Sequence, residues 1–371
     1  MRENMSKAKI VLLPGDGIGP EVCTEAELLI SAVAKAHGIE LEMETGLIGG
    51  AAIDATGEPL PQETLGICRQ ADAVMLGAVG GPKWSDPNAR VRPEQGLLAI
   101  RKELGLFANL RPVRVHPKLA AASPLKPEYL EGVDVMVVRE LTGGSYFGEK
   151  HEGDDFASDL CSYSRMEIER VVMQAGRIAR NRRGKLTLID KANVLATSRL
   201  WRKVTNELMA EHFPDVQYET ILVDAAAMFL ISKPASFDVI VTENMFGDIL
   251  TDEASMLAGS MGLLPSASLG AGKIGLYEPI HGSAPDIAGQ GIANPFGMLA
   301  SVAMMFDYSL GMKEAAEQIE RVIWDCISNG ECTVDLGGTL STSEAGAAVR
   351  KRLVQCDTAL GEQGRSVAPQ G

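Results

Sequence analysis

Cysteine and histidine are scarce in this chain, and their placement argues against a zinc site. The 371 residues include six cysteines and five histidines. No Cys-x-x-Cys pair occurs and no histidine lies at a zinc-ligand spacing, so any bound metal is expected to have oxygen ligands. Scattered cysteines are typical of reduced cytoplasmic thiols rather than of a disulfide framework. The six are Cys23, Cys68, Cys161, Cys326, Cys332 and Cys356.

Basic residues are outnumbered, and long apolar runs are missing. The formal net charge is −14, which repels nucleic-acid phosphates, so we expect no nucleic-acid partner. The longest apolar runs, such as Ile10–Leu13, are far too short to span a membrane. The polar segment Met1–Lys9 has no apolar signal-peptide region behind it. We therefore expect a cytoplasmic protein whose length suits two domains.

Short apolar runs alternate with helical patterns through most of the length. This alternation predicts an α/β fold with a mainly parallel sheet. The expected strands include Ile10–Leu13, Ala73–Leu76, Val133–Val138, Leu186–Ile189, Thr220–Val223 and Val239–Val241. The expected helices include Met166–Arg180, Arg199–His212, Phe246–Ala258, 293–308 and 313–328. The last two are expected to close the ordered part, and Glu362–Gly371 to form a loose tail.

Charged and polar side chains follow four of the expected strands. They are Arg139 and Glu140, Asp190 and Lys191, Asp224, and the run Thr242–Asn244. Ligands bind beyond the carboxyl ends of the strands in open α/β sheets. One charge at the start of a loop would indicate nothing, but four such strand ends together favour a site at one rim of the sheet.

Glycines near the start of the chain have the outline of a dinucleotide fingerprint. Segment 14–20, Pro-Gly-Asp-Gly-Ile-Gly-Pro, follows an expected strand and precedes an expected helix. The fingerprint needs a third glycine at the position that Pro20 occupies. We therefore interpret the segment as a tight strand-to-helix turn and not as a standard Rossmann site.

An acidic helix is expected within 242–253. Asp248 and Asp252 are four residues apart, so their side chains lie one turn apart on one face. Asp252 borders an apolar stripe, where a carboxylate is costly unless it is paired or bound to a cation. A solvated acidic helix is the simpler interpretation of this segment alone. Together with Asp224, however, the two carboxylates can form an oxygen site for Mg²⁺ or Mn²⁺.

Three arginines lie near these segments in an otherwise acidic protein. They are Arg101, Arg111 and Arg139. Arginine binds carboxylates through two parallel hydrogen bonds, so the set favours a diacid ligand. Each arginine taken singly would be explained by solubility.

The segment 281–295 is rich in glycine and contains Asp286. Its backbone amides could approach a pyrophosphate, with the carboxylate holding a ribose hydroxyl. Ordinary turn chemistry explains the composition equally well.

Six motifs in this order resemble those of the β-decarboxylating dehydrogenases, the isocitrate and isopropylmalate dehydrogenase family. The resemblance covers about Ile10–Leu353 and, because the motifs are independent, is far more specific than one glycine pattern. The motifs are LLPGDGIGPEV at 12–22, GLLAIRKELGLFANLRP at 96–112, RELTGGSYFG at 139–148, DKANVL at 190–195, TENMFGDILTDEAS at 242–255 and HGSAPDIAG at 281–289.

The resemblance implies a two-domain α/β fold of the isopropylmalate dehydrogenase type, with a mainly parallel sheet and without a standard Rossmann domain. The first domain would hold both chain ends, 1–107 and 260–371. The second would span 108–259.

The resemblance also implies a homodimer with shared active sites. The region 246–258 would form the dimer contact, and an arm near 150–165 would clasp the partner. Lys191 and Asp224 would act in the neighbouring subunit's site.

Individual roles follow from the same resemblance. Lys191 would take the proton of the substrate hydroxyl, and Tyr146 would protonate the enolate at C3 after CO₂ is lost. The metal ligands would be Asp224, Asp248 and Asp252, with Asp224 also near the substrate. The three arginines would bind its carboxylates. NAD would be held by Glu94, His281, Gly282, Ser283, Ala284, Pro285, Asp286, Ile287 and Asn294.

A branched 2-hydroxy diacid is the expected substrate, with 3-isopropylmalate and leucine biosynthesis the first expectation. Leu97 and Leu98, which are expected to open a helix, would form an apolar wall for the isopropyl group together with Val194, although filling the core is a simpler role for the leucines. D-malate, tartrate, isocitrate and homoisocitrate are alternative substrates. A non-catalytic regulatory subunit and a Mg²⁺-dependent hydrolase are alternatives of other classes, but the presence of Tyr146 and Lys191 argues against the former.

Overall fold

The computed structural model describes residues 7–84, 86 and 89–365, with side chains as far as Gln355. Parts of three expectations lie outside this description. They are the polar start of the chain, the side chain of Cys356 and the end of the expected loose tail.

The chain forms two compact units. The first consists of Met1–Ile100 and Lys273–Gly371, and the second of Arg101–Gly272. The domains expected from the sequence combine the same parts of the chain, with boundaries after residue 107 and before residue 260. Those boundaries stay a prediction.

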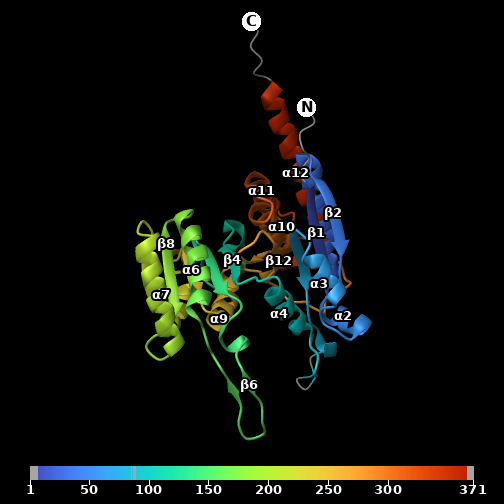
Figure 1. The fold of residues 1–371 in the computed structure, drawn as a ribbon. Coiled ribbons are helices and arrows are strands. Elements are labelled where there is room, and N and C mark those ends of the chain that lie inside the picture. The colour runs from blue at the N-terminus through green and yellow to red at the C-terminus, as the bar shows by residue number, and fades with distance from the viewer. Residues whose placement is uncertain (1–6, 85, 87–88, 366–371) are drawn as a thin grey trace. The chain divides into compact units, whose positions relative to one another are not determined.

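Four parallel strands form the sheet of the first unit, in the order β2-β1-β3-β12. Strand β3 is buried along its whole length, as a parallel strand covered on both faces should be. Pairing of β12 with β3 brings the C-terminal part of the chain back to the N-terminal part, and α12 lies against α1 (Figure 1). The strands are β1 (Lys7–Gly15), β2 (Glu40–Thr45), β3 (Ala73–Ala78) and β12 (Gly275–Pro279).

The helices of this unit cover the sheet. Helix α10 is apolar nearly all round and is almost fully buried, which is typical of a central helix. The helices are α1 (Gly19–His37), α2 (Gly49–Thr56), α3 (Gln62–Cys68), α10 (Phe296–Tyr308), α11 (Lys313–Ser328) and α12 (Thr342–Arg365), with short 3-10 helices η1 (Pro82–Trp84) and η7 (Val334–Leu336). Helix α4 (Pro93–Glu103) contains the boundary at Ile100.

Six strands form the sheet of the second unit, in the order β11-β4-β5-β10-β8-β9. Strand β4 is antiparallel to both of its neighbours, and the last four strands are parallel to one another. The strands are β4 (Ala108–Arg114), β5 (Asp134–Glu140), β8 (Lys185–Asp190), β9 (Gln217–Leu222), β10 (Val239–Thr242) and β11 (Pro265–Leu269).

Helices pack on both faces of this second sheet. Helix α6 begins with a capping box, in which Ser164 Oγ accepts from the Glu167 N–H and Glu167 Oε2 accepts from the Ser164 N–H at 2.7 Å. Val135 and Val137 of β5 share one buried apolar cluster with Ile240 and Leu250. The helices are α5 (Pro127–Leu130), α6 (Arg165–Arg180), α7 (Ala196–His212), α8 (Val223–Ser232) and α9 (Asn244–Ser255), with η2 (Pro117–Ala122), η3 (Gly144–Tyr146), η4 (Pro234–Ser236), η5 (Met256–Ala258) and η6 (Met261–Leu263).

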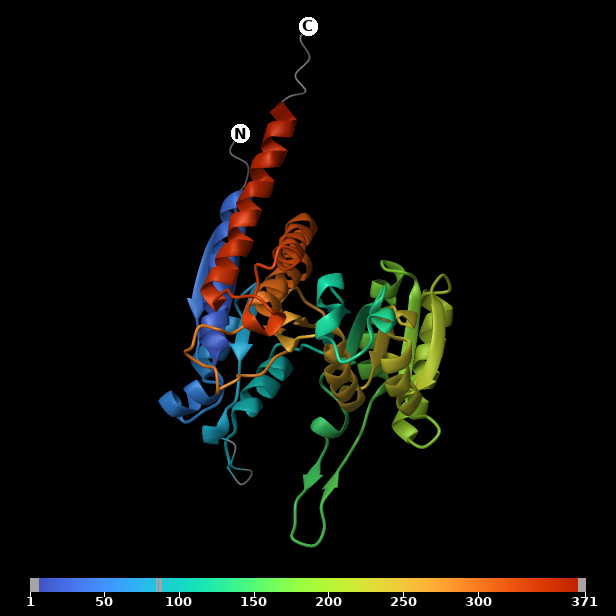
Figure 2. The same cartoon turned by 180° about the vertical axis from the view of Figure 1, so that it is seen from behind.

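A two-stranded hairpin lies within the arm expected near 150–165. Its strands are β6 (Lys150–His151) and β7 (Ser158–Asp159), and Figure 2 shows it extending away from the sheet of its unit. The side chains of Phe156 and Leu160 are 65% and 54% exposed.

The predicted α/β class is confirmed, and three local expectations are wrong. The ordered part does not close with α11, because α12 continues to Arg365 and includes the first residues of the expected loose tail. Strand β9 ends at Leu222, so Val223 and Asp224 belong to the first turn of α8. Helix α4 begins at Pro93, a favourable first helical residue, so Leu97 and Leu98 lie in its second turn rather than at its start.

Five cysteines are described by the structure, and none of them is in a disulfide. Cys23, Cys68, Cys161, Cys326 and Cys332 carry free thiols. Among the helices of the described residues, none has the length and apolar character needed to cross a membrane.

Candidate active site

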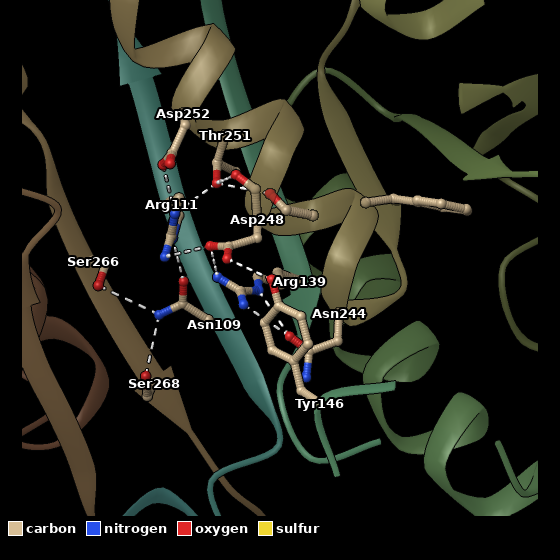
Figure 3. Close-up of polar contacts among 12 residues, drawn as sticks. Asn109, Arg111, Arg139, Tyr146, Asn244, Asp248, Thr251, Asp252, Ser266 and Ser268 are labelled. Atoms are coloured by element: carbon tan, nitrogen blue, oxygen red, sulfur yellow. Dashed lines mark hydrogen bonds and ion pairs between the residues drawn. The ribbon is translucent and has the colours of Figure 1, made fainter. Parts of the chain in front are cut away.

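Helix α9 presents two carboxylates beside the parallel strands of the second unit. It starts directly after β10, and Glu243 Oε1 caps it by accepting the Phe246 N–H at 2.8 Å. Asn244, Asp248 and Asp252 follow at intervals of four residues, so their side chains lie along one face, as Figure 3 shows. The neighbouring strand β5 delivers Arg139 to this face.

Arg139 is buried and is held by two side chains of α9. Its Nε and Nη2 donate to Asn244 Oδ1 at 3.1 and 2.8 Å, and its Nη1 donates to Asp248 Oδ1. Gly247 makes this approach possible, because a Cβ there would lie 2.6 Å from Arg139 Cγ. The arginine, although 105 residues from Asn244 in sequence, is therefore fixed by the helix.

Arg111 approaches the same carboxylates from β4. Its Nη1 lies 3.6 Å from Asp252 Oδ1, and its Nη2 lies 3.8 Å from Asp248 Oδ1. Two further bonds fix the guanidinium: Nε donates to Asn109 Oδ1 at 2.7 Å, and Nη1 to Thr251 Oγ1 at 2.6 Å (Figure 3). The two aspartates thus face two buried arginines.

Tyr146 completes this cluster from the loop after β5. Its hydroxyl donates to Asp248 Oδ2 at 2.9 Å, and the Arg139 guanidinium lies 5.7 Å from the centre of its ring. Burial, reinforced by the negative charge of Asp248, raises the pKa of Tyr146 above the usual tyrosine value. The hydroxyl is therefore protonated at neutral pH and can act as an acid.

The charges of this cluster influence one another. Burial lowers the pKa of Arg139, the charge of Asp248 raises it, and the charge of Arg101 lowers it again, so Arg101 lies within electrostatic range. Burial raises the pKa of Asp252, opposed by Arg111 and reinforced by Asp248. The structure therefore brings together Arg111, Arg139, Tyr146 and two of the three expected metal ligands, with Arg101 close enough to influence Arg139 electrostatically.

Lys191 and Asp224 pair with each other instead. Their Nζ and Oδ2 atoms lie 3.1 Å apart, and the hydrogen bond from Lys191 lowers the pKa of Asp224. Asp190 positions this segment, because it accepts two hydrogen bonds from Arg202 at 2.7 and 2.8 Å and one from the Ala192 N–H at 2.9 Å.

The three expected metal carboxylates are not gathered within one chain. No group of three or more His, Cys, Asp or Glu side chains that could hold a metal occurs in the described parts of the chain. The resemblance implies that Asp224 comes from the neighbouring subunit, so one chain does not test the site of Asp224, Asp248 and Asp252, which stays a prediction. Asp248 and Asp252 still offer the oxygen ligands that suit Mg²⁺ or Mn²⁺.

The glycine-rich loop in the first unit is anchored by the turn at 14–20. The Ile18 N–H donates to Ser283 O at 2.8 Å, and a Cβ on Gly17 would overlap that carbonyl oxygen. Glu21 accepts the N–H groups of Gly289 and Gly291. The turn between β1 and α1 therefore supports the expected cofactor loop, in agreement with a structural role for its glycines.

The loop has features that suit a bound nucleotide. Ala284 has φ +36°, a conformation that L residues seldom adopt. His281 Nε2 is buried and has no hydrogen-bond partner within the described residues, and burial lowers the pKa of this histidine. Asn294 donates to Asp335 Oδ2 at 2.9 Å. An unpaired buried nitrogen in a strained loop fits a site that binds a polar ligand.

The sequence is also similar to that of a known protein family. The model of the isocitrate/isopropylmalate dehydrogenase family matches residues 9–349. The chain belongs to the isocitrate/isopropylmalate dehydrogenase family.

Individual family members are similar over nearly the whole chain. A 3-isopropylmalate dehydrogenase from Anaeromyxobacter dehalogenans is 58% identical over 351 residues, covering 93% of this chain and 99% of the relative. One from Rhodopirellula baltica is 55% identical over 355 residues, covering 93% and 99%. The crystal structure of an isocitrate dehydrogenase from Methylococcus capsulatus has a TM-score of 0.82 at 34% identity, covering 93% of this chain and 99% of that one.

Several residues that hold the cluster were not identified from the family motifs. Asn109 fixes Arg111 and in turn donates to Ser266 and Ser268 of β11, at 3.3 and 3.1 Å (Figure 3). Two signals could have found such residues. Asn109 lies two residues before Arg111 on the same strand face, and Asn244 lies one helical turn before Asp248.

The residues expected to touch the isopropyl group and the nicotinamide lie in α4 and in the segment after β8. Leu97 and Leu98 are half-buried in α4, and Val194 is 63% exposed after β8. Glu94 lies in the first turn of α4, and a Cβ on Gly80 would lie 3.0 Å from its Oε1. Their roles toward these ligands stay predictions.

Proposed function

We propose that this enzyme oxidises and decarboxylates 3-isopropylmalate to 2-oxo-4-methylpentanoate with NAD and Mg²⁺ or Mn²⁺, as a step of leucine biosynthesis in the cytoplasm. The observation that carries the proposal is the cluster of Arg111, Arg139, Tyr146, Asp248 and Asp252 in a chain 58% identical to a 3-isopropylmalate dehydrogenase. Two buried arginines beside a protonated tyrosine and paired carboxylates suit a diacid that must lose CO₂ and gain a proton.

The candidate site residues of the second unit have the following roles in this proposal. Arg101, Arg111 and Arg139 bind the substrate carboxylates, and Asp248 and Asp252 hold the divalent cation together with Asp224. Lys191 accepts the proton of the 2-hydroxyl, and Tyr146 Oη delivers a proton to C3 after decarboxylation. When bound, the cation polarises the 2-hydroxyl and its carboxylate, and NAD accepts the hydride.

In the first unit, the loop from His281 to Asn294 would hold the cofactor. The free Nε2 of His281 offers an acceptor, and the carboxylate of Asp286 suits a ribose diol. Glu94 would face the nicotinamide end.

A homodimer accounts for two observations. Lys191 and Asp224 pair away from Asp248 and Asp252, so a partner subunit would supply them to the shared site. Helices α8 and α9 and the adjoining η5 also expose apolar side chains, which a monomer would rarely leave in water. They are Met228, Ile231, Ile249 and Met256, which are 50–61% exposed.

Substrate preference tests the proposal directly. We expect kcat/KM for 3-isopropylmalate to exceed that for D-malate by more than tenfold, since burying a three-carbon branch contributes about 2 kcal/mol at ~0.8 kcal/mol per carbon. Isocitrate would bury a carboxylate against Leu97 and Leu98 and should react poorly. Initial rates of NADH formation with the three substrates side by side provide the measurement.

A double variant tests the expected apolar wall. Leu97→Ala combined with Leu98→Ala should reduce the preference for 3-isopropylmalate over D-malate. Leu28→Ala, an exposed position on α1, is the control and should leave it unchanged. Parent enzyme that used isocitrate or D-malate as efficiently as 3-isopropylmalate would refute the substrate assignment.

Cofactor choice should follow Asp286. A carboxylate can accept hydrogen bonds from a ribose diol but repels a 2′-phosphate, so we expect kcat/KM for NAD to exceed that for NADP by more than about tenfold. Asp286→Ala should lower this ratio. Steady-state kinetics with both cofactors provide the measurement, and equal efficiency in the parent would show that Asp286 does not face the ribose.

A further inference from the structure

We propose that Tyr163 is a positioning residue for the active site: its hydroxyl ties the loop that carries Tyr146 to the first turn of α9. Tyr163 precedes the N-cap of α6 and appears in none of the roles assigned above. The inference rests on the proposed function, because it concerns the acid and the cation ligands of the same site.

The Tyr163 hydroxyl makes two buried hydrogen bonds at the start of α9. It donates to Glu243 Oε2 at 3.1 Å and accepts the Asn244 N–H at 3.0 Å. Since Glu243 Oε1 caps the helix at Phe246, the hydroxyl and the cap together satisfy N–H groups that the first turn would leave unpaired. Tyr163 therefore sets where α9 begins.

The ring of Tyr163 supports the Tyr146 loop. A Cβ on Gly143 would lie 2.5 Å from Tyr163 Cε1, and one on Gly144 would lie 2.5 Å from its hydroxyl. Gly144 also has φ +72°, and its N–H donates to Ser162 O at 3.1 Å. The chain passes this closely over the ring only because both residues are glycine.

Asn244 connects this support to the reactive groups. Its Nδ2 donates to Gly143 O at 3.2 Å, while its Oδ1 accepts from Arg139 at 2.8 and 3.1 Å. Arg139 and Tyr146 then meet on the two oxygens of Asp248. Through Asn244, these hydrogen bonds connect Tyr163 to the groups of the active-site cluster. A change at Tyr163 therefore affects Arg139, Asp248 and Tyr146 together.

Trp201 packs against the ring of Tyr163. The two aromatic rings are 5.4 Å apart and meet edge-to-face at 83°, and Trp201 is 2% exposed. The packed Tyr163 ring in turn holds Gly143 and Gly144 of the loop in one place. Such support from outside the reacting groups is how a site keeps its acid within reach of its substrate.

Tyr163→Phe tests the proposal because it keeps the ring and removes only the hydroxyl. Tyr163 reaches Asp248 only through Asn244 and Arg139, so its effect should stay at or below the lower end of the roughly 10–100-fold loss typical of a partner bonded directly to a metal ligand. We therefore expect kcat to fall and the dissociation constant for Mn²⁺ to rise, each by about three- to tenfold. The KM for NAD should change less than about twofold, because the expected cofactor loop belongs to the other unit. Paramagnetic resonance of Mn²⁺ titrated into the enzyme without cofactor measures binding independently of turnover.

Tyr277→Phe is the matched control. Tyr277 is fully buried, and its hydroxyl bonds Ser309 Oγ at 2.7 Å within the first unit, whereas α9 belongs to the second unit. It should lower the melting temperature but leave kcat and the Mn²⁺ constant unchanged. Glu243→Gln, which keeps the shape of the cap, should shift both constants in the same direction as Tyr163→Phe, by less.

The outcomes separate this inference from the proposed function. Parent enzyme that reduces NAD with 3-isopropylmalate, while Tyr163→Phe matches Tyr277→Phe in kcat and in Mn²⁺ binding, would overturn the positioning role alone. Parent enzyme without that activity would overturn the proposed function instead. A selective loss of kcat and Mn²⁺ affinity in Tyr163→Phe would support the inference.

Discussion

Chelation with EDTA is expected to abolish turnover, and Mg²⁺ or Mn²⁺ is expected to restore it. Asp248 and Asp252 lie on a helix without lysine or arginine, and Arg111 and Arg139 from β4 and β5 balance their charges. When these guanidinium groups bind a diacid, they are no longer available to the aspartates. A cation must then compensate the partly buried negative charge.

The expected loss is about a thousandfold or more in kcat, because charge stabilisation by the cation contributes several kcal/mol. The measurement is NADH formation after exhaustive chelation and again after each metal is added back. EDTA saturated beforehand with Mg²⁺ is the control and should have no effect. Full activity of the chelated enzyme would remove the metal from the mechanism.

Tyr146→Phe should impair decarboxylation more than hydride transfer. The phenylalanine keeps the ring beside Arg139 but loses the proton that the hydroxyl, now bonded to Asp248 at 2.9 Å, would deliver to C3. A lost general acid typically costs about 10²–10⁴-fold in rate, so we expect kcat to fall within this range.

A single-turnover experiment distinguishes the two halves of the reaction. NADH should still appear in a burst, while release of the decarboxylated product lags behind it. Tyr129→Phe, at a side chain 43% exposed on α5, is the control and should behave as the parent. Turnover of the Tyr146→Phe variant at the parent rate would show that another group supplies the proton.

Local sequence patterns were sufficient for the four parallel strands and three of the helices of the second unit. The continuous apolar run Val133–Val138 predicted β5, and the amphipathic stretch Met166–Arg180 matches α6 nearly residue for residue. The expectation that four strand ends share one rim is confirmed, because β5, β10, β8 and β9 are parallel neighbours. Apolar periodicity is a local property, and the sequence displays it directly.

Some local signals were missed or misplaced. Helix α12 begins in a region with glycines at 337, 338 and 346, which weaken a helical pattern although the helix forms. A tight turn after β1 was predicted correctly from Pro20. That this turn holds the loop at Ser283 through Ile18 was not, because the contact joins segments more than 260 residues apart.

By itself, the sequence determined the α/β class, the family and the identity of most candidate groups, since motifs and periodicity are written along the chain. Only the tertiary structure decided how these groups are paired. It joined Tyr146 and Arg139 to Asp248 across more than a hundred residues, and it left Lys191 with Asp224. The physical reason is that such pairs depend on strand order, helix packing and the space beside glycines, which arise only when the chain folds.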